Sequence, residues 1–150
     1  MKILIKREEL KRAINSIIGV VDKKQTMPIL GHILLETNNK FLKLTATNLE
    51  VQISSVAEVT KMDSFESIAV SGRKFYEIIR SLDSKEVELT TIKEQFVIKT
   101  RNSSYKISTL SGNDFPLFDR SDSSETININ QEKLLTLFNK THFSMAQQDV

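Results

Sequence analysis

The 150-residue sequence predicts an α+β fold, with two amphipathic helices packed on one side of antiparallel sheets. Three observations support this prediction. Apolar residues recur at helical spacing in two long segments, a short β-prone stretch precedes each segment, and several alternating runs follow each of them. The order of one strand, one helix and three strands therefore occurs twice, as a repeat of pattern and not of residue identity.

Three segments have the 3.6-residue periodicity that gives a helix one apolar face. They are residues 7–19, 72–82 and 131–142. The apolar stripes are Leu10, Ala13, Ile14, Ile17 and Ile18 in the first, Phe75, Ile78, Ile79 and Leu82 in the second, and Leu134, Leu137, Phe138 and Thr141 in the third. Each helix follows a stretch expected to form a strand, namely residues 2–6, 67–70 and 126–130.

The runs after the first two helices are rich in β-branched residues or alternate between apolar and polar side chains, as strands do. They are residues 29–37, 41–47 and 49–59 after the first helix, and 86–92, 95–101 and 104–110 after the second. Turn-forming residues separate them at 38–40 and at Asn102–Ser103. Such strands are expected to pack one face on a core and to expose the other.

The stretch 119–125 is acidic, rich in serine and free of apolar residues, which predicts a linker. It divides the chain into a first domain at 1–118 and a second part at 126–150. The second part would contain the opening strand and helix of a further unit, whose own three strands do not follow in this sequence.

Composition narrows the possible functions. The chain has no cysteine, which excludes disulfides, a thiolate nucleophile and cysteine-ligated metals, and favours a cytoplasmic protein. No apolar run is long enough to span a membrane. The net charge is only +2, yet residues 1–26 hold seven basic and three acidic side chains, whereas residues 111–135 hold two basic and five acidic ones. Such asymmetry is compatible with one side that faces a polyanion.

Catalytic and metal-binding patterns are missing from the sequence. His32 and His142 lack the spacing of a helical zinc pair, and Glu8 and Glu9 would point about 100° apart on a helix. There is no phosphate-binding loop and no nucleophile elbow. The sequence therefore predicts a protein that is not an enzyme and that uses no metal or cofactor.

Basic residues lie opposite the apolar stripes of the first two helices and in the loop after the first. They are Lys11, Arg12, Lys23, Lys24, Arg73, Lys74 and Arg80. If the two helices lie side by side, these residues form a mildly basic surface suited to loose, salt-dependent phosphate contacts. The alternative interpretation is an ordinary solvated helix face.

Five stretches carry a resemblance to a known family. They are "TMPILGHILLET" at 26–37, "LTATNLEVQI" at 44–53, "SGRKFYEIIRSL" at 71–82, "YKISTLSGNDFP" at 105–116 and "FSMAQQD" at 143–149. In this order and spacing they resemble the bacterial sliding clamps, the β subunits of DNA polymerase III. Two positions depart from the family pattern: Asn48, where aspartate is usual, and Asp83, where proline is common.

The resemblance implies the DNA clamp fold and a processivity factor without chemistry of its own. Clamps of this family have three domains of like fold, and two chains close head to tail into a ring around duplex DNA, with helices lining the hole. This chain would be the first domain and the start of the second. The implied partners are duplex DNA, the third domain of a second clamp subunit, and the polymerase and clamp loader, whose peptide pocket lies between the second and third domains, outside this chain.

The resemblance also implies roles for individual residues, which extend the reading of the basic helices. DNA contacts are expected from Lys11, Arg12 and Lys23 on the ground of their charge, and the resemblance implies contacts by Lys24, Arg73 and Gln148. The ring interface is expected at the edge strand 104–109, with Lys74, Asn102, Ser104, Tyr105 and Ile107. Arginines of some relatives are replaced by Asn102 and Ser104, so an ion-pair part of that interface is not expected here.

Two other classes of function stay open on the sequence. One is a stand-alone interaction module that keeps the fold and the edge strand, caps or inhibits a full clamp, and does not encircle DNA. The other is a small hydrolase with an unrecognised site, against which the lack of any catalytic constellation argues.

Overall fold

The computed structural model describes residues 2–21, 27–38, 40–63, 67–118 and 127–145. The chain divides into two compact units, Met1–Phe118 and Asp119–Val150.

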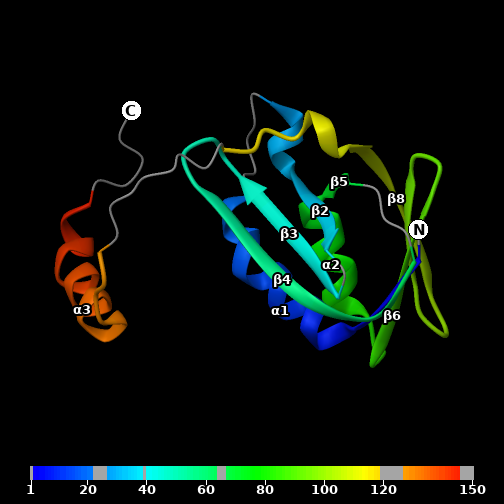
Figure 1. The fold of residues 1–150 in the computed structure, drawn as a ribbon, viewed down its shortest axis with the longest axis horizontal. Coiled ribbons are helices and arrows are strands. Elements are labelled where there is room, and N and C mark those ends of the chain that lie inside the picture. Colours follow the sequence, from blue (N-terminus) through cyan, green and yellow to red (C-terminus); the bar gives the residue numbers. More distant parts are fainter. Residues whose placement is uncertain (1, 22–26, 39, 64–66, 119–126, 146–150) are drawn as a thin grey trace. The chain divides into compact units, whose positions relative to one another are not determined.

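The first unit contains the predicted order of one strand, one helix and three strands twice (Figure 1). The first copy consists of β1 (Lys2–Lys6), α1 (Arg7–Ile17) with the 3₁₀ turn η1 (Ile18–Val20), the 3₁₀ turn η2 (Pro28–Gly31), β2 (His32–Asn38), β3 (Phe41–Thr47) and β4 (Gln52–Met62). The second consists of β5 (Ile68–Ser71), α2 (Gly72–Ser81), β6 (Glu86–Ile92), β7 (Gln95–Lys99), β8 (Ser104–Ser111) and the 3₁₀ turn η3 (Gly112–Asp114).

Two strands begin later than the sequence predicts. The strand expected from residue 29 begins at His32, because Pro28 starts a 3₁₀ turn instead, a position that suits a residue without an N–H group. The strand expected from residue 49 begins at Gln52, because Asn48 Oδ1 accepts backbone hydrogen bonds from Glu50 (3.1 Å) and Val51 (2.8 Å) and closes a turn. The amide oxygen of Asn48 accepts the same turn hydrogen bonds that an aspartate carboxylate could accept. The turn is therefore compatible with asparagine at the position where the family usually has aspartate.

The eight strands in the described residues are antiparallel and form one closed ring in the order β1-β4-β3-β2-β5-β8-β7-β6. Strand β1 pairs with β4 of its own copy and with β6 of the other, and β5 pairs with β8 of its own copy and with β2 of the other. Each copy therefore donates its first strand to the sheet of the other. Neither copy can complete its hydrogen-bonded ladder alone.

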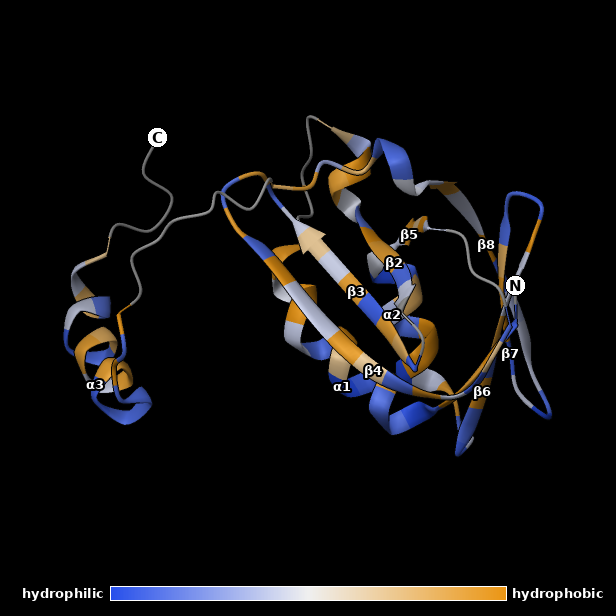
Figure 2. Ribbon diagram, in the orientation of Figure 1, coloured by the Kyte–Doolittle hydropathy of each residue, from blue (hydrophilic) through white to orange (hydrophobic). Residues whose placement is uncertain are grey.

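Helices α1 and α2 contact each other and pack against the inner side of the strands (Figure 1). Apolar residues concentrate where helices and strands face one another (Figure 2). At the centre, the rings of Phe75 and Phe96 meet edge to face with centroids 5.4 Å apart, and both side chains are fully buried. The fold class expected from the sequence is confirmed: two helices cover one side of antiparallel sheets.

The second unit contains α3 (Gln131–Thr141) and the 3₁₀ turn η4 (His142–Ser144). Asn130 caps the helix, because its Oδ1 accepts hydrogen bonds from the backbone N–H groups of Glu132 (3.0 Å) and Lys133 (3.2 Å). The strand expected at 126–130 is wrong for the described residues 127–130, which form no regular structure. A strand needs a neighbour to satisfy its backbone groups, and no described segment of this unit supplies one. None of the helices in the described part of the chain is long and apolar enough to cross a membrane.

Candidate nucleic-acid interface

The solvent-exposed sides of α1 and α2 form the surface for which the sequence predicts DNA binding. We call this surface the helix face. Its charged residues are Glu8, Glu9, Lys11, Arg12, Arg73, Lys74, Glu77 and Arg80. The two helices lie side by side, as the prediction required, because their apolar stripes share one core. Arg80, which the sequence placed on the same basic surface, is exposed on this face.

On α1 the predicted cations have acidic partners one turn earlier. Arg12 pairs with Glu9, and Lys11 Nζ lies 4.0 Å from Glu8 Oε2. Exposed pairs of this kind contribute only about 0–1 kcal/mol, so they break readily. A phosphate that approaches α1 therefore competes with a carboxylate for each cation.

Two arginines link the helices. Arg7 links the start of α1 to the last turn of α2, and Arg73 links the start of α2 to the segment just after η1. Arg7, at the start of α1, donates from Nε to the carbonyl of Ile79 (3.2 Å) and from Nη2 to the carbonyl of Arg80 (3.1 Å). Arg73, in the first turn of α2, donates from Nη2 to the carbonyl of Val21 (3.2 Å), just after η1. Both arginines thus satisfy carbonyls near a helix end, where cations are favoured.

Sequence reasoning assigned no role to Arg7. One signal could have found it: a cation in the first turn of a helix is opposed by the helix dipole and therefore calls for a specific partner. The same signal applies to Arg73, which was assigned to DNA alone. Its hydrogen bond to Val21 means that this guanidinium is already engaged in the fold.

The structure brings Lys11, Arg12 and Arg73 onto one face. Lys23, Lys24 and Gln148 lie outside the described residues. DNA contact by any of the six stays a prediction.

The proposed ring interface lies on β8. One edge of this strand pairs with β7 from Ser104 to Ser108, whereas β5 covers the other edge only from Thr109 to Ser111. In the described part of the chain, the second edge of residues 104–108 has no strand partner. The bonds Thr100 N to Ser103 O and Thr109 N to Glu94 O fix the phase of the ladder, so the N–H of Lys106 points away from β7.

The side chains assigned to that interface differ in availability. Asn102, Ser104 and Tyr105 are exposed, and Lys74 lies on α2, which packs against β8. Ile107 is only 8% exposed and belongs to the core. Its side chain faces inward opposite Phe96, and its part in the ring interface stays a prediction.

The described residues contain no group of three or more acidic or histidine side chains arranged to hold a metal ion. His32 is engaged locally, since its Nδ1 lies 2.9 Å from the carbonyl of Pro28.

Comparisons with known proteins agree with the fold. The family model described as DNA polymerase III beta subunit, N-terminal domain, matches residues 1–119. A beta sliding clamp of Pseudomonas putida is 34% identical over 151 residues, which cover all of this chain and 41% of that protein. A beta sliding clamp sequence of Vibrio harveyi is 35% identical over 147 residues, which cover 96% of this chain and 100% of that sequence.

Two solved structures show the same similarity. A DnaN sliding clamp of Pseudomonas aeruginosa bound to griselimycin superposes with a TM-score of 0.92 at 34% identity, covering 100% of this chain and 41% of that one. The Caulobacter crescentus pol III beta gives 0.94 at 28% identity, covering 100% and 40%. The chain thus spans about two fifths of the length of the full relatives that it matches first. It belongs to the family of DNA polymerase III beta subunits, the bacterial sliding clamps, and corresponds to their N-terminal domain.

Proposed function

We propose that this chain acts as the DNA-facing N-terminal domain of a processivity clamp, which encircles duplex DNA as a head-to-tail ring and catalyses nothing itself. The observation that carries the proposal is a family match over residues 1–119 that includes two adjacent helices with outward cations. Work on the chromosome would place the protein in the bacterial cytoplasm. The polymerase and the clamp loader would bind the full-length protein outside this chain.

The helix face suits loose contact with a moving duplex. Its arginines and lysines can approach phosphates, and phosphate contacts carry no sequence information. The glutamates on α1 compete with those phosphates for the cations, and this competition keeps each contact weak. A single domain has no topological hold, so its affinity should be about 10⁻⁴ M or weaker at physiological salt.

Titration of a labelled duplex over a salt series tests this function. Arg12→Gln should weaken binding about two- to fivefold and reduce the slope of log K against log salt by about 0.9. Lys43→Gln is the matched control, because it removes a cation from the outer side of β3, where Lys43 pairs with Glu36 (3.1 Å). Binding that survives high salt, prefers one sequence, or responds equally to both variants contradicts the proposal.

The competing carboxylates give the opposite test. Glu9→Gln frees Arg12 and should strengthen duplex binding about two- to fivefold. Glu58→Gln changes the net charge equally on the outward side of β4, and should have a smaller effect. Equal gains in the two variants would mean that only net charge matters.

A second candidate function rests on the free edge of β8. We propose that residues 104–108 pair with a strand of another clamp chain, so that the chain alone can cap a full clamp. Such an interface joins two different surfaces, so the isolated chain should be monomeric in sedimentation. Mixed with a full-length clamp, it should form a heterodimer, and Lys106→Pro should abolish this by removing an outward N–H without breaking the β7 ladder. A tight homodimer, or a heterodimer that tolerates Lys106→Pro, contradicts this candidate.

A further inference from the structure

The outer side of β1, β4, β6, β7 and β8 carries a second group of cations. Strand register places Lys61, Leu4, Glu88 and Lys99 side by side across four strands, and Lys2, Thr90, Val97 and Lys106 in the adjacent row. We call this surface the sheet face and define it by Lys2, Leu4, Lys61, Glu86, Glu88, Lys99, Arg101 and Lys106. Alternation along β1 explains its direction, because Ile3 and Ile5 are buried on the inner side.

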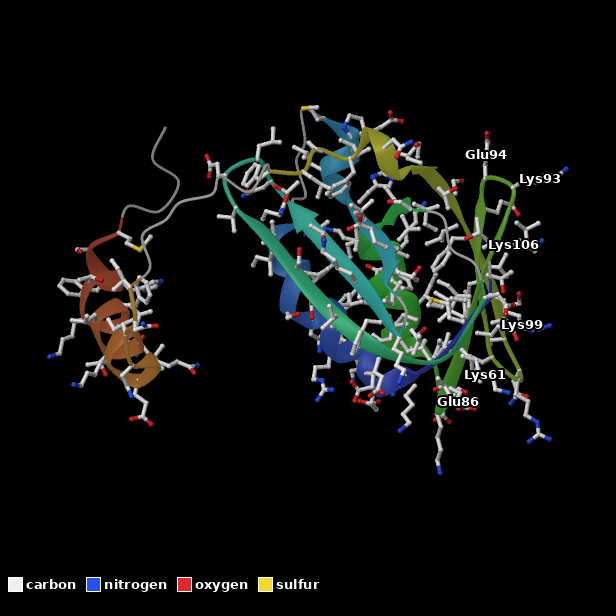
Figure 3. All side chains as sticks on the ribbon, in the orientation of Figure 1. Lys61, Glu86, Lys93, Glu94, Lys99 and Lys106 are labelled. Carbon is white, nitrogen blue, oxygen red and sulfur yellow. The ribbon has the colours of Figure 1, made fainter. Side chains whose placement is uncertain are left out.

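Most cations of the sheet face lack an acidic partner. In the part of the chain that the structure describes, no carboxylate lies within 4.0 Å of the charged groups of Lys61, Lys99 or Arg101. Lys99 and Lys106 project from the strands (Figure 3). On α1 of the helix face, by contrast, both Lys11 and Arg12 have an acidic partner. Unpaired surface cations keep their full attraction for an anionic partner.

One acid of the sheet face is already neutralised. Glu88 Oε2 lies 2.9 Å from Lys2 Nζ, and this hydrogen-bonded ion pair raises the pKa of Lys2. Glu88 therefore offers little repulsion to an incoming anion. Glu86 has no described ion pair and lies at one end of the surface.

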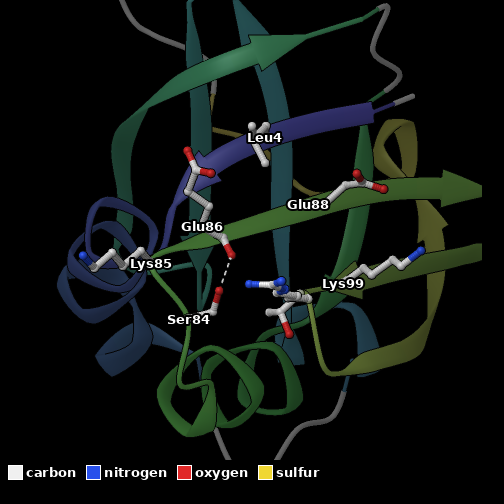
Figure 4. Close-up of a pocket in the computed structure, with 8 residues that line it drawn as sticks. Leu4, Ser84, Lys85, Glu86, Glu88 and Lys99 are labelled. Atoms are coloured by element: carbon white, nitrogen blue, oxygen red, sulfur yellow. Dashed lines mark hydrogen bonds between the residues drawn. The ribbon is translucent and has the colours of Figure 1, made fainter.

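A shallow groove of about 550 Å³ lies at the end of this surface where Glu86 and Arg101 are found (Figure 4). The half-buried Leu4 contributes an apolar wall, while Lys99 and Arg101 provide cations and Glu86 a carboxylate. Its size suits a few amino-acid side chains. An arginine can bind a carboxylate through two parallel hydrogen bonds, which makes Arg101 a specific as well as a charged contact.

We propose that the sheet face binds an acidic peptide segment of another protein, with carboxylates at Lys99 and Arg101 and an apolar side chain over Leu4. Two observations favour a peptide over nucleic acid. The groove has an apolar wall at Leu4, which a peptide side chain can cover and a phosphate backbone cannot, and none of the sheet-face residues is aromatic, so bases have nothing to stack on. This site is independent of the proposed DNA contact, which uses the helices.

The test uses the full 150-residue chain and a fluorescein-labelled decapeptide with four glutamates around a central leucine. Fluorescence anisotropy should show salt-dependent binding, which Lys99→Gln and Arg101→Gln each weaken about fivefold. Both side chains are exposed, so thermal unfolding should be unchanged in these variants. Arg12→Gln, on the helix face, is the matched control and should leave peptide binding unchanged.

Several outcomes would overturn the proposal. One is equal binding of a peptide in which glutamine replaces every glutamate. Another is an Arg12→Gln effect as large as that of Lys99→Gln. A third is that Lys99→Gln and Arg101→Gln weaken binding of a twelve-base-pair duplex more than that of the peptide, which would make the sheet face a nucleic-acid surface. Loss of duplex binding in Arg12→Gln alone concerns the helix face and leaves this inference intact.

Discussion

Helices α1 and α3 have the same length and the same kind of amphipathic sequence, yet their environments differ completely. In α1, Leu10, Ala13, Ile14 and Ile17 are buried. In α3, none of the residues is buried, and Leu137 and Phe138 are more than half exposed. Apolar periodicity therefore predicts a helix, but it does not show whether another part of the protein covers the apolar side of that helix.

The consequence is a difference in the source of stability. Helix α1 is held by the core of the first unit, whereas α3 relies on its Asn130 cap and on local hydrogen bonds. A lone helix of eleven residues is marginal in water. If stability arises in this way, substitutions in the core of the first unit should cost far more free energy of unfolding than substitutions in α3.

Truncating one phenylalanine in each unit gives the sharpest contrast. Phe75→Ala in α2 should lower the free energy of unfolding by about 3–5 kcal/mol, because it leaves a cavity beside Phe96. Phe138→Ala in α3 removes a side chain that is 61% exposed and should change stability by less than about 0.5 kcal/mol. Urea unfolding of both variants measures the difference. Comparable losses would show that α3 has a packing partner.

Loosening the connection between α1 and α2 should have an intermediate effect. Arg7→Met removes two hydrogen bonds to carbonyls in the last turn of α2 and an ion pair with Glu8, and should lower the free energy of unfolding by about 1–2 kcal/mol. The Arg7 side chain is 18% exposed, so solvent screens it only in part. Arg12→Met is the control, because Arg12 is 75% exposed and pairs only with Glu9 in the described contacts, and it should cost less than about 0.5 kcal/mol. Equal costs would argue that Arg7 acts only through its charge.

The ion pair on the sheet face should give a smaller, pH-dependent effect. The hydrogen bond and charge of Glu88 raise the pKa of Lys2 above its ordinary value of 10.5. The ionised lysine therefore stabilises the fold at pH values below 10.5, and this contribution is lost as pH rises through the raised pKa. Lys2→Gln should be slightly less stable than the parent protein near neutral pH and equally stable at the alkaline end. A difference that grows with pH would contradict the assignment.

Removing the second unit should have the smallest effect. A chain that ends at Phe118 should melt within about a few degrees of the full chain, because the exposed α3 adds no buried core of its own. Thermal melts of the two chains decide the point. A larger drop would place residues 119–150 inside the cooperative fold, and the boundary proposed at the acidic stretch 119–125 would then be wrong.

Much of the architecture could be predicted because its causes are local. Alternation along 41–47 and 86–92 predicts β3 and β6 with their observed bounds, and the stripe from Leu10 to Ile17 predicts α1. These patterns need only neighbouring residues. The same holds for the motifs by which the sequence resembles the sliding clamps, a resemblance that the family match confirms.

Predictions that required distant partners were less complete. The strand expected at 126–130 does not form over residues 127–130, since no described segment of the second unit pairs with it. Tyr105 and Ile107 are two residues apart, so the sequence places both on the same side of their strand. Only the tertiary structure, which sets Ile107 opposite Phe96, buries Ile107 and leaves Tyr105 exposed. The role of Arg7 depends on carbonyls more than seventy residues away.

The sequence by itself determined the order of helices and strands in the first unit, and the family. Only the tertiary structure decided that β1 and β5 are exchanged between the two copies, that Lys11, Arg12 and Arg73 of the helix face are paired with acids or a carbonyl, and that the cations of the sheet face are mostly unpaired. The physical reason is the separation along the sequence between the residues that interact. Periodicity is a property of adjacent residues, whereas strand exchange and charge pairing depend on which segments the closed ring brings together.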